Sequence, residues 1–196
     1  PPRSTLFPYT TLFRSMSDGS CVLNPRFFRT EEKELVRVQR KLSKTEKGSS
    51  ERKEAIKIVQ RVHERISNKR YDFVHQLSRQ LVNNYSFIAL EDLNIKNMIK
   101  DHYLAKSIAD AAWNKLITAT KYKAESAGSM VVLVNPANTS KMCSRCGLLV
   151  EKALADRVHK CDSCGLIMDR DHNAAINILR LGLQSVGIKT VEAHRL

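Results

Sequence analysis

Apolar residues recur at three- and four-residue spacing along two long, otherwise charged stretches in the first half of the chain. The first covers residues 31–44 and opens with three glutamates, whose charges favour the positive end of a helix dipole. The second covers residues 50–84, with Ser50 as its expected N-cap. A Gly-Ser-Ser step at 48–50 separates them, so the pattern predicts two antiparallel amphipathic helices.

Short apolar runs alternate with helical patterns in the second half. YSFIAL at residues 85–90 is typical of a buried strand, and it presents Glu91 at its end. MVVLV at 130–134 is a second such run. Residues 107–127 and 173–181 have helical spacing. Because strands alternate with helices, the pattern predicts an α/β fold.

Four of the five cysteines form two Cys-x-x-Cys pairs, and a glycine follows each pair. Tight turns of this kind point both thiolates at one ion, and four thiolates complete a tetrahedral zinc shell with no open position. A redox dithiol or an iron–sulfur cluster fits the paired spacing less well. His159 is not needed as a ligand, and the isolated Cys21 is expected to be a plain thiol. The predicted zinc ligands are Cys143, Cys146, Cys161 and Cys164.

The chain has a net charge of +13, which favours a polyanionic partner, with nucleic acid first and an anionic membrane second. Residues 26–79 hold 16 Lys and Arg against 8 Asp and Glu. A solvated basic surface is the alternative to a clamp for phosphate backbones. No apolar run is long enough to span a bilayer, and no secretory signal is present. The candidate nucleic-acid contacts are Arg40, Lys41, Lys57, Arg61, Arg65, Lys69 and Arg70.

Carboxylates stand at the ends of two predicted elements. Glu91 closes the first strand, and Asp169 and Asp171 precede the last helix. Hydrolysis of nucleic acid by two metal ions needs several carboxylates that converge from rigid elements. Each also has a structural interpretation, because Glu91 could lie in a strand-end turn and either aspartate could cap the helix.

Residues 5–15, TLFPYTTLFRS, have no helical or strand period. All eleven match the translation of a common DNA sequencing adapter, so we interpret residues 1–15 as non-native and expect them to have no packing role. We expect the native part of this sequence to begin at or near Met16, and we expect the gene to encode further sequence upstream of it.

The order of these motifs resembles TnpB, the family of RNA-guided nucleases carried by bacterial insertion sequences and often labelled transposases. The matching stretches are DGSCVLNPRFF, VQRKLS, HERISNKRYDFVHQLSRQLV, ALEDLNIKNM, HYLAKSIADAAW, NPANTSKMCSRCG and CDSCGLIMDRDHNAAINILRLG. The resemblance implies an incomplete RuvC-like (RNase H-type) α/β domain with a long helical hairpin insertion and a small zinc-ribbon insertion.

The family's active site has three acids. Carried over by motif, the second is Glu91 and the third is Asp171, with Asp169 as the less favoured alternative. The first acid precedes the turn at Asp18-Gly19-Ser20, and no acid stands upstream of that turn here. The resemblance also implies structural zinc, catalytic Mg²⁺, a guide RNA, a DNA target and a cytoplasmic, nucleoid-associated protein.

These observations divide the rest of the chain into four parts. The partial RuvC-like domain covers residues 16–134, the zinc ribbon 135–168, the last motif and helix 169–182, and the tail 183–196. The helical hairpin occupies 31–84. We expect a nuclease fragment that is inactive without the first aspartate. The alternatives are a zinc-ribbon nucleic-acid-binding protein that regulates transposition and a strand-transferring transposase.

Overall fold

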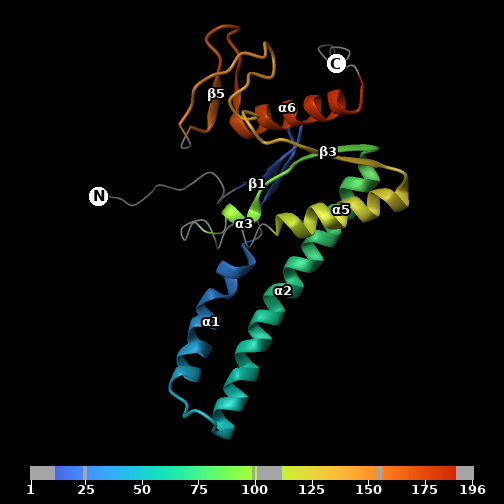
Figure 1. Cartoon of the computed structure of the whole chain (residues 1–196). Coiled ribbons are helices and arrows are strands. Elements are labelled where there is room, and N and C mark those ends of the chain that lie inside the picture. The colour runs from blue at the N-terminus through green and yellow to red at the C-terminus, as the bar shows by residue number, and fades with distance from the viewer. Residues whose placement is uncertain (1–11, 24–25, 99, 101–111, 154–155, 189–196) are drawn as a thin grey trace.

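The chain is a mixed α/β molecule in which a long helical hairpin extends away from a body of short strands and further helices (Figure 1). The structure is a computed structural model, and it describes residues 12–23, 26–98, 100, 112–153 and 156–188. None of the helices in these ranges combines the length and the apolar character that crossing a membrane requires.

The helical hairpin consists of α1 (Phe27–Ser43) and α2 (Ser50–Asn84), as the two amphipathic patterns predict. Both helices keep their polar residues outward and their apolar stripes toward each other. The seam between them buries four aliphatic side chains: Leu35, Val38, Val62 and Ile66. Each such side chain stabilises the contact by about 1.5–3 kcal/mol relative to exposure.

The ends of the hairpin helices correct two details of the prediction. α1 begins about one turn earlier than expected, at Phe27, whose ring packs edge-on against Phe73 with centroids 5.9 Å apart. The three glutamates therefore lie beyond the first turn, and their assignment to the positive end of the dipole is wrong. The N-cap of α2 is Ser49 rather than Ser50, because the Ser49 side chain accepts the backbone N–H of Arg52.

β3 (Phe87–Glu91) and β4 (Met130–Val134) are the two predicted strands, and they pair in parallel with Glu91 opposite Val134. A parallel pair needs a crossover connection, which α3 (Ile95–Met98) and α5 (Trp113–Ala127) provide. The helix predicted at 107–127 is confirmed from Trp113 onward, and its first residues, 107–111, lie outside the described ranges.

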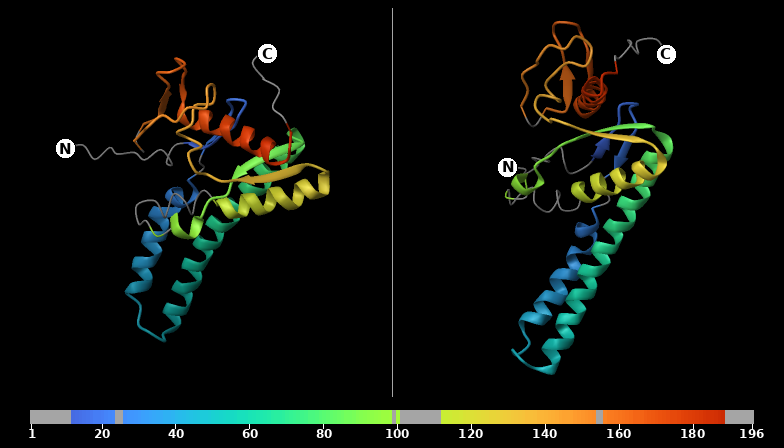
Figure 2. Two further views of the ribbon diagram at one scale, coloured as in Figure 1. Left: turned by 45° about the horizontal axis from the view of Figure 1, so that its top comes forward. Right: turned by 45° about the vertical axis from the view of Figure 1, so that its right-hand side comes forward.

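One face of this strand pair rests on the C-terminal half of α2 and on α5. The shared core contains Val74, Leu77, Leu81, Ile88, Leu90, Leu116 and Ala119. α6 (Arg170–Ser185) contacts both β3 and β4, and Figure 2 shows it running past these strands on the side away from the helical hairpin. It is longer at both ends than the predicted 173–181, because Asp169 caps it and it continues past Gly182.

Gly182 sets the distance between α6 and β3. A Cβ atom at Gly182 would lie 2.7 Å from the Cβ atom of Ala89, closer than real Cβ contacts allow. The absence of a side chain therefore permits this close helix–strand approach.

β1 (Leu12–Ser15) and β2 (Cys21–Leu23) form an antiparallel pair, joined by a turn that contains Gly19 at φ 85°. The expectation that residues 1–15 have no packing role is wrong for residues 12–15, since β1 also contacts α6. A strand ladder is made by backbone groups, so an extended segment can pair whatever its side chains are.

The cysteine-bearing region folds around β5 (Val158–Lys160) and β6 (Ile167–Asp169), a short antiparallel pair placed directly before α6. It forms a separate lobe beside the N-terminal end of α6 (Figure 1).

Candidate active site and metal centre

Two matching turns bring the four cysteines together. The N–H of Cys143 donates to the carbonyl of Leu148, and the N–H of Cys161 donates to that of Leu166. Each turn closes at a glycine in the left-handed region, Gly147 at φ 79° and Gly165 at φ 73°. The four Sγ atoms lie within 4.8 Å of one another.

The sulfur positions fit a tetrahedral ion. The Cys143–Cys164 and Cys146–Cys161 sulfurs are each 3.6 Å apart. Four ligands about 2.3 Å from a zinc ion would lie about 3.8 Å from one another. Hydrogen bonds from the backbone N–H of Cys164 and from the thiols of Cys146 and Cys164 lower the pKa of the Cys161 thiol to about 7, while burial and the neighbouring thiols raise the pKa of Cys164 to about 12. One thiol of the cluster therefore loses its proton readily, and a metal ion would have to displace the proton of Cys164. The cluster can therefore hold a metal ion, and zinc suits an all-thiolate shell.

His159 lies beneath the cysteine cluster without belonging to it. Its ring is fully buried, and Lys152 Nζ contacts its Nδ1 and donates to the carbonyl of Ser140. Burial lowers the pKa of both Lys152 and His159. His159 is thus a buried residue of β5, and the metal-sized cluster in the described residues consists of cysteines alone.

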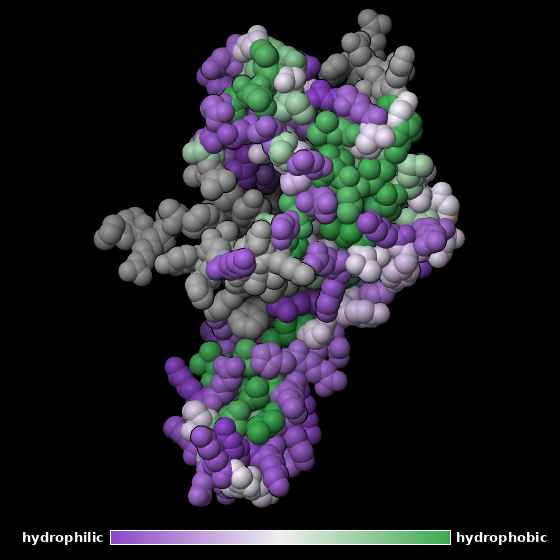
Figure 3. Space-filling view, viewed as in Figure 1, coloured by the Kyte–Doolittle hydropathy of each residue, from purple (hydrophilic) through white to green (hydrophobic). Residues whose placement is uncertain are grey.

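Glu91 and Asp171 line one cavity. This cavity, about 380 Å³ in volume, lies between β3, α6 and the end of β1, and we call it the carboxylate cavity. Its walls are largely apolar, including Ile88, Ala175 and Ile178. Figure 3 shows apolar side chains gathered on the face between α6 and α5.

Neighbouring side chains hold both carboxylates in place. The hydroxyl of Thr139 donates to Glu91 Oε1 at 2.8 Å. The guanidinium of Arg170 donates to Asp171 Oδ1 from Nε at 3.2 Å and from Nη2 at 3.1 Å, and Arg170 itself is buried. Asp169 has a different position, since its Oδ1 accepts the N–H groups of Asp171 and His172 and caps α6.

Among the described residues, three or more His, Cys, Asp or Glu side chains come close enough to share a metal ion only at the four cysteines. Glu91 and Asp171 therefore have no third acid beside them in this part of the chain. Asp18 is held in the turn between β1 and β2 by the hydroxyl groups of Ser20 and Tyr85, at 2.6 and 2.7 Å. These hydrogen bonds lower the pKa of Asp18 to about 2. Asp18 therefore acts as a turn residue.

Two family models match the chain. One, described as "Probable transposase" (OrfB_IS605), matches residues 11–101, and the other, "Cas12f1-like, TNB domain", matches residues 113–178. A "Putative RNA-guided DNA endonuclease" of Streptomyces pristinaespiralis is 40% identical over 171 residues, and TnpB-like protein MJ1635 of Methanocaldococcus jannaschii is 34% identical over 134. The chain belongs to the TnpB family.

This TnpB chain spans less than half the length of those relatives. The alignments cover 86% of it against 42% of the Streptomyces protein, and 67% of it against 31% of the Methanocaldococcus protein. A cryo-EM structure of a Cas12f1–sgRNA–target DNA complex shares the fold, with a TM-score of 0.56 and 21% identity over 82% of this chain and 43% of the other.

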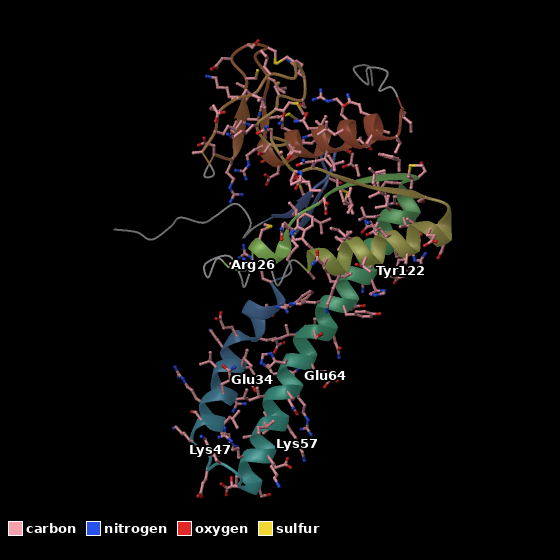
Figure 4. All side chains as sticks on the ribbon, viewed as in Figure 1. Arg26, Glu34, Lys47, Lys57, Glu64 and Tyr122 are labelled. Atoms are coloured by element: carbon pink, nitrogen blue, oxygen red, sulfur yellow. The ribbon has the colours of Figure 1, made fainter. Side chains whose placement is uncertain are left out.

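The basic residues predicted from the sequence to contact nucleic acid are spread along the hairpin. Arg40 and Lys41 stand in the last turn of α1, and the other five lie on α2. Three of them pair with glutamates: Lys57 with Glu54, and Arg65 and Lys69 with Glu31. The hydrogen bond and charge of Lys69, together with Arg65, lower the pKa of Glu31. Figure 4 shows Lys57 on the part of α2 farthest from the strands.

Sequence reasoning missed the buried amides that join the cysteine lobe to α6. Asn173 accepts the N–H of Ser144 and donates to the carbonyl of Met142, while Asn177 donates to the carbonyls of Thr139 and Met142. Both asparagines are fully buried. They recur at four-residue spacing on the apolar face of a predicted helix, which is the signal that could have identified them.

Proposed function

We propose that this chain carries part of the active site of an RNA-guided, Mg²⁺-dependent DNA endonuclease of the TnpB type. The observation that supports this most directly is the position of Glu91 and Asp171 on one cavity, although they are 80 residues apart in the sequence. A fixed pair of carboxylates at strand and helix ends suits Mg²⁺, which prefers oxygen ligands.

In this proposal, Glu91 and Asp171 provide two of three metal-binding acids in a RuvC-like domain. Bound Mg²⁺ would activate water and stabilise the charge that develops on the scissile phosphate. Thr139 orients Glu91, and Arg170 orients Asp171. Asp171 is favoured over Asp169, because the Asp169 carboxylate is engaged in capping α6. The third acid would come from outside the described residues.

The cysteine lobe is, in the same proposal, a zinc ribbon with a structural role. Its four thiolates leave no open position for substrate or water. Hydrogen bonds from Asn173 and Asn177 would transmit its rigidity to α6, which carries Asp171.

The helical hairpin would contact the phosphate backbones of a guide RNA paired with target DNA. Its Lys and Arg side chains project along α1 and α2 into solvent, where Arg40, Lys41 and Arg61 are exposed. Such contacts carry no sequence preference and weaken steeply with added salt. In an RNA-guided complex, base pairing with the guide supplies the sequence specificity.

Metal binding at the carboxylate cavity tests the active-site proposal directly. Mn²⁺ should bind the zinc-loaded chain, and electron paramagnetic resonance should detect the bound ion. Glu91→Gln and Asp171→Asn should each weaken this binding about tenfold or more, while Asp162→Asn, an exposed carboxylate of the cysteine lobe, should not. Mn²⁺ binding that neither cavity variant affects would contradict the proposal.

Cleavage assays separate the proposed nuclease from its alternatives. With two carboxylates, the chain should bind a guide RNA and target duplex in Mg²⁺ without cutting the DNA. Cutting that Asp171→Ala abolishes would show that a third acid is unnecessary. Joining of DNA ends in place of hydrolysis would instead favour a strand-transferring transposase.

A further inference from the structure

Three side chains form a row of rings across the junction of α2 and α5, outside the carboxylate cavity and the cysteine lobe. The rings of Tyr71 and His75 lie 4.0 Å apart between centroids with planes inclined at 38°. Those of His75 and Tyr122 lie 6.4 Å apart at 47°, and Tyr122 Oη is 3.4 Å from His75 Nδ1. Figure 4 marks Tyr122 on α5.

Both tyrosines are large aromatic residues whose side chains are exposed to solvent. Tyr71 is 58% exposed and Tyr122 is 46% exposed. Single exposed apolar residues are ordinary on protein surfaces, but a contiguous row of three rings indicates a contact surface. None of the three rings belongs to the hydrophobic core cluster described beside them, which places them on the surface of this junction.

The backbone beneath the rings is rigid. Lys123 is buried beside Tyr122, and its Nζ donates to the carbonyl of His75 at 2.6 Å and to the hydroxyl of Ser78 at 2.7 Å. This cross-helix link fixes the position of Tyr122 relative to His75. A ligand would therefore meet an ordered surface and would spend little binding energy on ordering it.

We propose that Tyr71, His75 and Tyr122 form a stacking platform for unpaired bases of single-stranded RNA. Aromatic faces accept any base, and in RNA recognition Tyr and His commonly serve this role. Each of the three rings also carries a hydrogen-bonding atom, which can engage the 2′-hydroxyl that distinguishes RNA from DNA.

The charges around the platform suit an RNA backbone. Arg79 lies close enough to Lys123 to affect it electrostatically, and Lys121 is exposed next to Tyr122. Of the nearby carboxylates, Asp72 accepts a hydrogen bond from the Gln76 amide, and Glu125 is exposed. The inference rests on the proposed binding of guide RNA, and it assigns part of that binding to stacking.

Fluorescence anisotropy with the zinc-loaded full chain tests the platform. The probes are a labelled single-stranded RNA of about 12 nucleotides, the same sequence as DNA, and an RNA duplex. The double variant Tyr71→Ala/Tyr122→Ala should bind the single-stranded RNA at least about fivefold more weakly and the duplex unchanged. Tyr71→Phe/Tyr122→Phe should keep the stacking and reduce the preference for RNA over DNA.

Two further variants serve as controls. Leu148→Ala removes an apolar side chain of similar exposure, 53%, from the cysteine lobe and should change nothing. Lys57→Ala/Arg61→Ala removes charge from the hairpin and should weaken all three probes in a salt-dependent way. Photo-crosslinking of wild-type chain to RNA containing 5-iodouridine should label Tyr71 or Tyr122, which does not depend on the folding of any variant.

The outcomes distinguish the two proposals. Unchanged RNA binding by the alanine double variant, or crosslinks elsewhere, would overturn the platform. A salt-dependent loss of binding in the hairpin variant would still support nucleic-acid binding by the chain. Equal loss of RNA and DNA binding would overturn the assignment to RNA. Failure of the wild-type chain to bind any probe at low salt would overturn both proposals.

Discussion

The cysteine lobe and the carboxylate cavity are built in opposite ways. The lobe takes its four candidate metal ligands from residues 143–164, on two turns whose geometry is set by local hydrogen bonds. The cavity takes its acids from β3 and α6, and Glu91 is held by Thr139, which lies 48 residues further along the chain. A site made by local turns can form wherever its segment folds, whereas a site made by packing depends on every contact that positions its elements.

Metal removal should produce the largest difference between the two regions. Cys161→Ser or chelation should unfold the cysteine lobe, because structural zinc contributes about 10–16 kcal/mol in small zinc domains. The helical hairpin should keep its helical circular dichroism, since its core is separate. Zinc content and limited proteolysis measure the effect.

Cys21→Ser is the matched control for this prediction. Cys21 is exposed and lies outside the cysteine cluster, so its loss should change neither zinc content nor proteolysis. Equal sensitivity of the two variants would mean that the cluster does not hold the lobe together.

Asn177→Ala should uncouple the lobe from the cavity. The change removes donors to the carbonyls of Thr139 and Met142 and leaves a buried gap, at a cost of about 2–4 kcal/mol. Thermal unfolding should show the loss, with zinc content maintained. Asn83→Ala, at an exposed position of α2, is the control. A variant as stable as the wild type would show that the two regions are independent.

Gly182→Ala should disturb the cavity alone. The added methyl group would meet the side chain of Ala89, so α6 must move away from β3 at a cost of about 1–3 kcal/mol. Chemical denaturation measures this cost, and Gln184→Ala on the exposed side of α6 should be neutral. Unchanged stability together with unchanged Mn²⁺ binding would show that the close approach is unnecessary.

The same contrast explains what the sequence could predict. The cysteine cluster, the long helices and the strands β3 and β4 follow from spacing and periodicity, which are local. The partners of Thr139, Asn177 and Gly182 could not be predicted, because each partner lies at least 35 residues away in the sequence. The start of α1 was wrong for a related reason, since the contact between Phe27 and Phe73 is made only after the hairpin closes.

The sequence does not predict the pairing of β1, because residues 5–15 match a translated adapter and residues 1–15 are therefore interpreted as non-native. Residues 5–15 have no period that predicts a strand, yet Leu12–Ser15 pairs with β2 through backbone groups. The turn that follows, with Gly19 at φ 85°, brings the two strands into register. The Asp18-Gly19 turn is the sequence signal that could have indicated this hairpin.

The smallest expected effect lies at the rim of the cavity, where Tyr85 donates to Asp18 and ties the β1–β2 pair to the end of α2. The folded-state pKa of Asp18 is lowered to about 2, below its ordinary value, so the bond stabilises the fold above about pH 4 and is lost as the pH falls toward 2. Because Asp18 is exposed, Tyr85→Phe should cost less than about 1 kcal/mol at pH 7 and nothing near pH 2. Denaturant unfolding of both proteins between pH 2 and 7 measures the difference, with Tyr71→Phe, at an exposed tyrosine of α2, as the control. A difference that stays constant across this range would show that the tyrosine acts through packing and not through the carboxylate.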